Sequence, residues 1–204
     1  RMSPSRNTSS KGGFATLGLS DTLLSSVTAV GYEEPTPVQA EMIPVMLGGR
    51  DLLAQAATGT GKTAAFALPM IQRMTEPAPR ADAHEERAQR SRRAAGIHEE
   101  RPRLVGRKQL PAPTGGLVLV PTRELAMQVS EAIHKYANGT DIIVVPLYGG
   151  AAMEQQIRAL DRGAHIVVAT PGRALDHIRR ETLRLNGIRV LVLDEADEML
   201  DMGF

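Results

Sequence analysis

The chain has 204 residues, of which 42% are hydrophobic and 23% charged, and its formal net charge is +1. This composition is typical of one globular domain with a hydrophobic core of its own. The sequence has no cysteine, which excludes disulfides, thiol nucleophiles and cysteine-ligated metal sites. The near-neutral charge and the aromatic content of 3% argue against a strongly basic or base-stacking surface. No apolar run is long enough to span a membrane, and we expect a cytoplasmic protein with no membrane partner.

The first part of the chain predicts a polar tail followed by two helices. Residues 1–13 are polar and are expected to form a disordered tail. Ser20 is suited to cap a helix whose apolar residues recur at helical spacing. Thr36 and Pro37 are typical of a cap followed by a proline in the first turn, and they predict a second helix that ends near Leu47.

From residue 51 onward, short apolar runs alternate with helical patterns. Residues 51–54 predict a short buried strand, and residues 62–74 predict an apolar helix after a glycine-rich turn. Later strands are predicted at 117–120, 142–145, 166–169 and 190–193, with helices between them at about 123–138, 152–161 and 172–180. This alternation is typical of an α/β fold with a parallel sheet covered on both faces. Ligands bind such folds at the carboxyl ends of the strands.

A phosphate-binding loop is predicted at the turn before residue 62. The run 56–63 reads Ala-Ala-Thr-Gly-Thr-Gly-Lys-Thr. Its glycines let backbone N–H groups point at phosphate oxygens, and the following helix adds partial positive charge. Lys62 would place its charge near the β- and γ-phosphates, and Thr63 would offer its hydroxyl to Mg²⁺. The alternative is a flexible turn, and the general motif has glycine where this chain has Ala56.

Three carboxylates follow the last predicted strand, in the run Asp194-Glu195-Ala196-Asp197. Like charges this close repel each other, and a bound Mg²⁺ would explain their presence after a buried strand. Asp194 is best placed to hold the metal, and Glu195 is the candidate to orient or deprotonate water. The alternative is an acidic helix N-terminus, which the helix dipole favours.

These two motifs and four others resemble those of the DEAD-box ATP-dependent RNA helicases. The segment 31–39 is similar to the family's Q motif, and the phosphate loop has the family's form, in which the first position is Ala. Pro121–Ala126, Gly149-Gly150 and Thr170–Arg173 are similar to the three motifs that line the RNA path. All six occur in the family's order between Phe14 and Asp197. The resemblance implies a RecA-like three-layer sandwich with a mostly parallel central sheet, the fold of P-loop NTPases.

The resemblance also implies how ATP is bound. Gln39 would read the adenine edge, because a side-chain amide both donates and accepts hydrogen bonds. Phe14 and Tyr32 would support the base or the motif. The alternative for Gln39 is an exposed polar residue at a helix start. The phosphates would be bound by the loop residues Ala57, Thr58, Gly59, Thr60, Gly61, Lys62 and Thr63.

Catalysis would rest on Lys62, Asp194 and Glu195 in the roles given above. Thr63 and Asp194 would be the Mg²⁺ ligands, and ATP and Mg²⁺ the cofactors. In the family, the residue at Asp197 couples the nucleotide site to neighbouring motifs rather than binding metal.

The implied RNA path consists mainly of small residues with two arginines. Small residues at strand ends expose N–H groups and hydroxyls to phosphates, so binding would be independent of base sequence. Without the resemblance, the turn at 170–172 would be interpreted as nothing more than a turn. The residues expected to contact RNA are Pro121, Thr122, Arg123, Gly149, Gly150, Thr170, Pro171, Gly172 and Arg173.

The charged segment from Glu76 to Leu110, within an insertion at about 76–114, is longer than we expect for the family. Its composition can bury little surface, so it is either a solvated appendage or an accessory contact for RNA or a protein partner. The five histidines show no metal-ligand spacing and are given no role.

The chain ends seven residues after Asp197. The family continues with a Ser-Ala-Thr motif and a second RecA-like domain that carries catalytic arginines. We therefore expect residues 14–204 to be the N-terminal ATP-binding domain of a larger RNA helicase, cut short of its boundary. Alone it would bind ATP or ADP without unwinding. The alternatives are a nucleotide-binding module with weak RNA affinity and a DNA helicase, the latter disfavoured by the Q motif.

Overall fold

The computed structural model describes residues 13–76 and 114–203. The predicted tail, except Gly13, and the predicted insertion, except its ends, lie outside the described residues. The described chain begins with a 3-10 turn, η1 (Gly13–Thr16). Its helices are α1 (Asp21–Ala29), α2 (Pro37–Leu47), α3 (Lys62–Thr75), α5 (Arg123–Tyr136), α6 (Met153–Asp161), α7 (Pro171–Arg179) and α8 (Ala196–Asp201). Its strands are β1 (Gly116–Leu119), β2 (Val144–Leu147), β3 (Ile166–Ala169) and β4 (Val190–Leu193).

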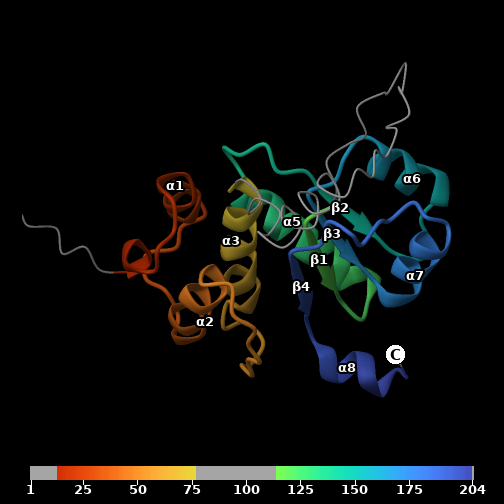
Figure 1. Cartoon of the computed structure of the whole chain (residues 1–204). Helices are drawn as coiled ribbons and strands as arrows, with labels where there is room; N and C mark the ends of the chain where they lie inside the picture. Colours follow the sequence, from red (N-terminus) through yellow and green to blue (C-terminus); the bar gives the residue numbers. More distant parts are fainter. Residues whose placement is uncertain (1–12, 77–113, 204) are drawn as a thin grey trace, which may run out of the picture.

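The four strands form one sheet in the order β2-β3-β1-β4, and every pair is parallel. Along β3, successive side chains enter two different cores. Ile166 and Val168 pack with α3 and α5, whereas Val167 and Ala169 pack with α6 and α7. Figure 1 shows these helices on opposite sides of the sheet. The predicted three-layer α/β sandwich is therefore confirmed, and its sheet is parallel throughout.

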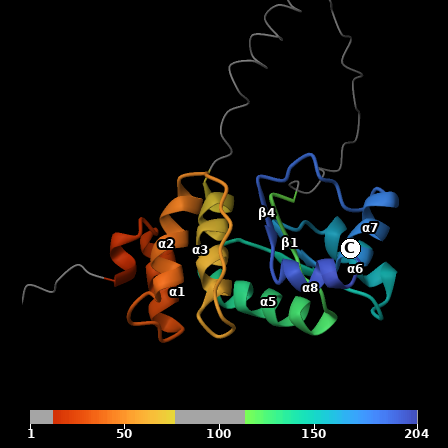
Figure 2. The same cartoon turned by 90° about the horizontal axis from the view of Figure 1, so that it is seen from below.

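Local sequence signals set the helix starts. Ser20 accepts a hydrogen bond from the Leu23 N–H at the start of α1. Thr36 and Gln39 form a capping box at the start of α2, where each side chain binds the other's backbone N–H. Helices α1, α2 and α3 lie side by side at one end of the molecule in both views (Figures 1 and 2). The long apolar face of α3, buried from Ala64 to Ile71, joins them to the sheet.

The predicted strand at residues 51–54 is wrong. The structure has no strand there, and the Leu53 side chain is fully exposed. Among the described residues β4 pairs with β1 alone, and a cavity of about 410 Å³ is lined by residues 49–54 and by β4. Apolar content favours burial, but a strand also needs a partner for its N–H and C=O groups, and this segment has none in the sheet. The phosphate loop therefore follows an irregular segment.

The second strand lies two residues later than predicted, at Val144–Leu147 instead of 142–145. Its register is set by β3, where Val144 pairs with Ile166. The strand contains Pro146, which cannot donate to a ladder and is tolerated because β2 lies at the edge of the sheet.

Candidate nucleotide and RNA site

The phosphate loop and the acidic run meet in space. Lys62 is the first residue of α3, and its Nζ donates to Glu195 Oε1 at 3.0 Å. The two residues are 133 positions apart in sequence, so the contact exists only because β4 delivers Glu195 beside the start of α3. Both side chains are partly shielded, with 22% and 30% exposure. The cation and the carboxylate that the two motifs were predicted to supply thus lie in one site.

Backbone geometry at this site is unusual at two positions. Gly61, the residue that precedes α3, has a φ of 87°, and a Cβ there would collide with the Gln39 side chain. Only glycine adopts this positive φ readily and also leaves room for the Gln39 side chain. Glu195 has a φ of 52°, a left-handed conformation that is uncommon for residues other than glycine. Among the described residues Glu181, after α7, shares this conformation, so the functional interpretation of Glu195 rests on its contact with Lys62.

The start of the Q-motif helix α2 binds the phosphate loop through two side chains. Thr36 Oγ1 donates to the Thr60 carbonyl at 2.8 Å, and Gln39 Nε2 donates to the Gly61 carbonyl at 3.2 Å. Gln39 Oε1 accepts from the Thr36 N–H, and the side chain is buried at 2% exposure. Gln39 is thus not the exposed helix-start residue of the alternative interpretation. Both ends of its amide are bonded within the protein, and its adenine contact stays a prediction.

Phe14 and Tyr32 stack on one another, with ring centroids 6.1 Å apart and planes 13° from parallel. Phe14 is buried, and the Tyr32 hydroxyl shares a 2.9 Å hydrogen bond with that of Tyr136. Burial raises the pKa of Tyr136 well above its usual value, so this hydroxyl stays protonated and able to donate. Phe14 thus packs against Tyr32 of the segment 31–39, and the role of the two residues in supporting the base or the motif stays a prediction.

The residues present fit a divalent cation. Burial, and next the neighbouring Glu195 charge, raise the pKa of Asp194, while Lys62 opposes the shift. The carboxylates of Asp194 and Glu195 repel each other, and Lys62 offsets this repulsion only in part. A bound cation would lower the repulsion further. Thr63, the second residue of α3, lies half-buried beside Lys62 and can offer a hydroxyl oxygen. Asp197 is exposed on α8. Oxygen ligands of this kind suit Mg²⁺.

Backbone hydrogen bonds join the motif-bearing strand ends into one row. The Thr170 N–H donates to Leu147 O, the Val120 N–H to Ala169 O, and the Asp194 N–H to Leu119 O. The loops after β2, β3, β1 and β4 therefore leave the sheet side by side, in that order. The three segments predicted to line the RNA path occupy neighbouring places, and the acidic run lies beyond them.

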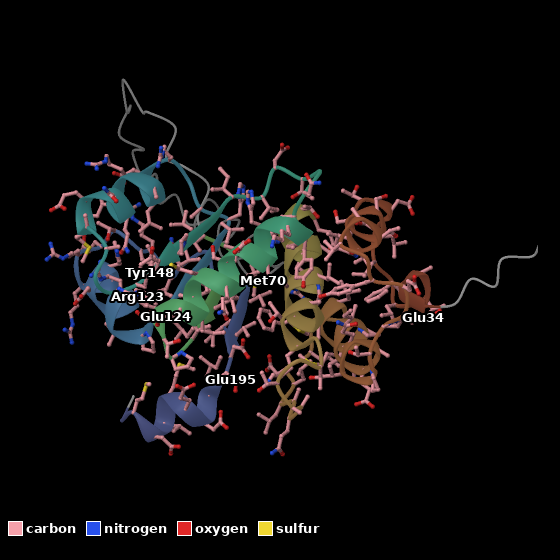
Figure 3. All side chains as sticks on the ribbon, turned by 180° about the vertical axis from the view of Figure 1, so that it is seen from behind. Glu34, Met70, Arg123, Glu124, Tyr148 and Glu195 are labelled. Atoms are coloured by element: carbon pink, nitrogen blue, oxygen red, sulfur yellow. The ribbon has the colours of Figure 1, made fainter. Side chains whose placement is uncertain are left out.

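The loops after β2 and β1 approach each other at Gly150 and Arg123. Thr122 caps α5 by accepting from the Leu125 N–H, and the Arg123 guanidinium pairs with Glu124 on the surface at 3.0 Å. Gly150, with a φ of 85°, lies so near that a Cβ there would be 3.3 Å from Arg123 Nη1. Figure 3 shows Arg123 and Glu124 near Tyr148, and Glu195 apart from them at the end of β4.

The loop after β3 contributes an arginine whose side chain is mostly buried. Thr170 precedes α7, Pro171 begins it, and Gly172 is exposed. Arg173, in contrast, has a side chain only 13% exposed and donates to Ala151 O and to Gln156 Oε1. Direct contact of Arg173 with RNA stays a prediction. In the structure, Arg173 binds the carbonyl of Ala151, directly after the two glycines Gly149 and Gly150.

Sequence reasoning missed two residues that these contacts bring forward. Gln156 is buried on the face of α6 that also carries Leu160, and His177 is fully buried on α7. A polar residue at helical spacing from a core leucine is the signal that could have found Gln156. His177 has a similar but weaker signal, because it lies three residues after the buried Ala174 on α7; its hydrogen-bond partners Gln156 and Thr182 could not be read from the sequence.

A model of the DEAD/DEAH box helicase family matches residues 36–204. The chain belongs to this family. The DEAD-box ATP-dependent RNA helicases CshA of Bacillus cereus (strain ATCC 10987 / NRS 248) and of Bacillus anthracis are each 47% identical to it over 191 residues. These matches cover 94% of the chain and 30% of each relative, so the chain spans about a third of their length.

Two solved structures agree with this membership. A DEAD box protein from Methanococcus jannaschii has a TM-score of 0.72 at 38% identity, covering 94% of this chain and 43% of that one. The RNA helicase Prp28 from Chaetomium thermophilum, bound to ADP, has a TM-score of 0.72 at 37% identity, covering 94% and 40%. No helix in the described residues is long and apolar enough to cross a membrane. The cytoplasmic location stays a prediction.

Proposed function

We propose that this chain is the N-terminal, ATP-binding domain of an ATP-dependent RNA helicase that unwinds or remodels RNA duplexes by ATP-driven closure of two RecA-like domains. The observation that carries the proposal is the 3.0 Å contact between Lys62 and Glu195, which joins the phosphate loop to the acidic run. The names of the relatives, which are RNA helicases, and the ADP-bound relative support RNA and adenine nucleotides as ligands.

In this proposal, Lys62 exchanges its partner when nucleotide binds. Its Nζ leaves Glu195 Oε1 for the phosphate oxygens, and the N–H groups at the start of α3 bind the same oxygens. Glu195 is then released to orient the attacking water and accept its proton. Thr63 and Asp194 would hold Mg²⁺, which when bound neutralises charge that develops on the phosphates.

RNA would lie across the loops after β2, β3 and β1, where the exposed glycines and the start of α5 offer backbone N–H groups. Arg123 adds charge at the surface of this row, since its side chain is 54% exposed. These groups reach phosphates and 2′-hydroxyls rather than base edges, so binding is independent of base sequence.

The decisive experiment measures nucleotide binding and RNA-stimulated ATP hydrolysis with this chain and with the full-length parent protein. The chain should bind ADP yet hydrolyse ATP at least about 10³-fold more slowly than the parent, since arginines supplied in trans contribute roughly 10³–10⁵ in related phosphoryl transfers. Absence of ADP binding would contradict the nucleotide domain. Rapid RNA-stimulated turnover by the chain alone would contradict the need for a second domain.

A further inference from the structure

A buried polar cluster, which we call the α6–α7 cluster, lies behind the proposed RNA path. It consists of Gln156 from α6, Arg173 and His177 from α7, and Thr182 after α7. Gln156 is 6% exposed and His177 is not exposed at all. Polar side chains buried to this degree are costly unless they are fully hydrogen-bonded, so a specific arrangement is required.

The donors and acceptors around Gln156 fit together in only one way. The Arg173 guanidinium can only donate, so the Gln156 atom 3.0 Å away must be its oxygen. The Gln156 nitrogen then donates to the Tyr148 carbonyl at 3.0 Å. Because Gln156 Oε1 is an acceptor, His177 Nε2, also 3.0 Å from it, must carry a hydrogen. Gln156 therefore makes three hydrogen bonds, each of which fixes the direction of the others.

Two of the cluster's bonds hold the glycine loop at both of its ends. Gln156 binds the carbonyl of Tyr148, directly before Gly149-Gly150, and Arg173 binds the carbonyl of Ala151, directly after them. The two glycines between these anchors are exposed. Glycine pays the largest entropic cost on ordering, so a loop of this kind stays in one conformation only where its flanks are fixed.

We propose that Gln156 is a positioning residue for RNA binding: it holds the glycine loop and Arg173 in the arrangement that presents the loop's N–H groups to RNA phosphates. This inference rests on the proposed function of the loop. Gln156 touches no RNA itself. It acts through Tyr148 and Arg173, and its oxygen also accepts a hydrogen bond from His177.

The test uses this chain with three substitutions. Gln156→Leu removes every hydrogen bond of the side chain. Gln156→Glu keeps the size and the acceptor for Arg173 and His177 but loses the donor to Tyr148. Gln155→Leu is the matched control, because Gln155 is the neighbouring glutamine on α6 and is exposed.

Four quantities are measured for each variant: amide hydrogen exchange at residues 149–152, affinity for a single-stranded RNA oligonucleotide, affinity for ADP, and melting temperature. We expect Gln156→Leu to accelerate loop exchange and weaken RNA affinity by about tenfold each, the equivalent of one or two lost hydrogen bonds. Gln156→Glu should show a smaller effect, strongest at Gly149. Affinity for ADP should not change, a separation that general destabilisation would not produce.

Loop exchange in Gln156→Leu equal to that of Gln155→Leu would overturn the inference, as would accelerated exchange with unchanged RNA affinity. If Gln156→Leu does not fold, the isosteric Gln156→Glu decides by the same comparison. If the wild-type chain does not bind RNA, the proposed RNA path itself is contradicted. This outcome differs from one in which the wild type binds RNA and Gln156→Leu binds it equally well, which contradicts only the positioning role of Gln156.

Discussion

Replacing Lys62 with alanine should weaken ADP binding strongly while leaving the fold nearly unchanged. The Lys62–Glu195 pair spans 3.0 Å, but its side chains keep 22% and 30% exposure, so its net contribution to folding is no more than about 1 kcal/mol. Contact with a phosphate is a hydrogen bond between charged groups, for which removal costs about 1.5–3 kcal/mol. The dissociation constant for ADP should therefore rise about 10- to 150-fold.

Fluorescence titration with a labelled ADP measures the affinity, and thermal melting measures the stability. Lys135→Ala is the matched control, because Lys135 pairs with Glu131 at 2.9 Å on the exposed side of α5, with more than half of each side chain exposed. The control should bind ADP as the wild type does. ADP affinity that is unaltered in Lys62→Ala would refute the phosphate-loop assignment. A drop in melting temperature much above about 4 °C would show that the ion pair matters for folding.

Three further substitutions probe the same site. Gln39→Ala should lower the preference for ATP over GTP if the amide reads adenine, whereas equal losses for both nucleotides would show that Gln39 acts only by holding Gly61. Glu195→Gln should abolish RNA-stimulated hydrolysis in the full-length parent without weakening ADP binding, and retained turnover would remove Glu195 from the chemistry. Asp194→Asn should raise the melting temperature at pH 7, because the raised pKa of Asp194 means that its charged form destabilises the fold. This gain should shrink as the pH falls through that raised pKa and vanish below the ordinary value of 3.8, and a gain that does not depend on pH would contradict the desolvation argument.

Much of the fold could be predicted because its signals are local. The caps at Ser20 and Thr36, and the apolar runs that became β3 and β4, are readable within a few residues. The error at 51–54 has the opposite cause. An apolar run becomes a strand only when it pairs with a neighbouring strand. Here a cavity separates residues 49–54 from β4, and that separation cannot be read from the run itself.

The candidate site divides in the same way. The loop 56–63 and the run 194–197 are recognisable from their residue types and spacing, so both could be found in the sequence. The contact between them could not be predicted, because Lys62 and Glu195 are far apart in sequence and only the folded sheet brings them together. The α6–α7 cluster could be predicted only in part for the same reason: helical spacing marks Gln156 as buried with Leu160, but its hydrogen bonds to Arg173 and His177 join residues of two helices that the fold brings together.

Strand order brings the two proposed binding regions together on one small sheet. The order β2-β3-β1-β4 places the three loops proposed for RNA next to one another and the acidic run last, beside the phosphate loop. The two regions adjoin at the β1–β4 pair, where the Asp194 N–H donates to Leu119 O one residue before the chain turns toward Pro121. In the proposed function, a change at Asp194 on nucleotide binding would occur next to β1, whose chain continues to Arg123 at the start of α5.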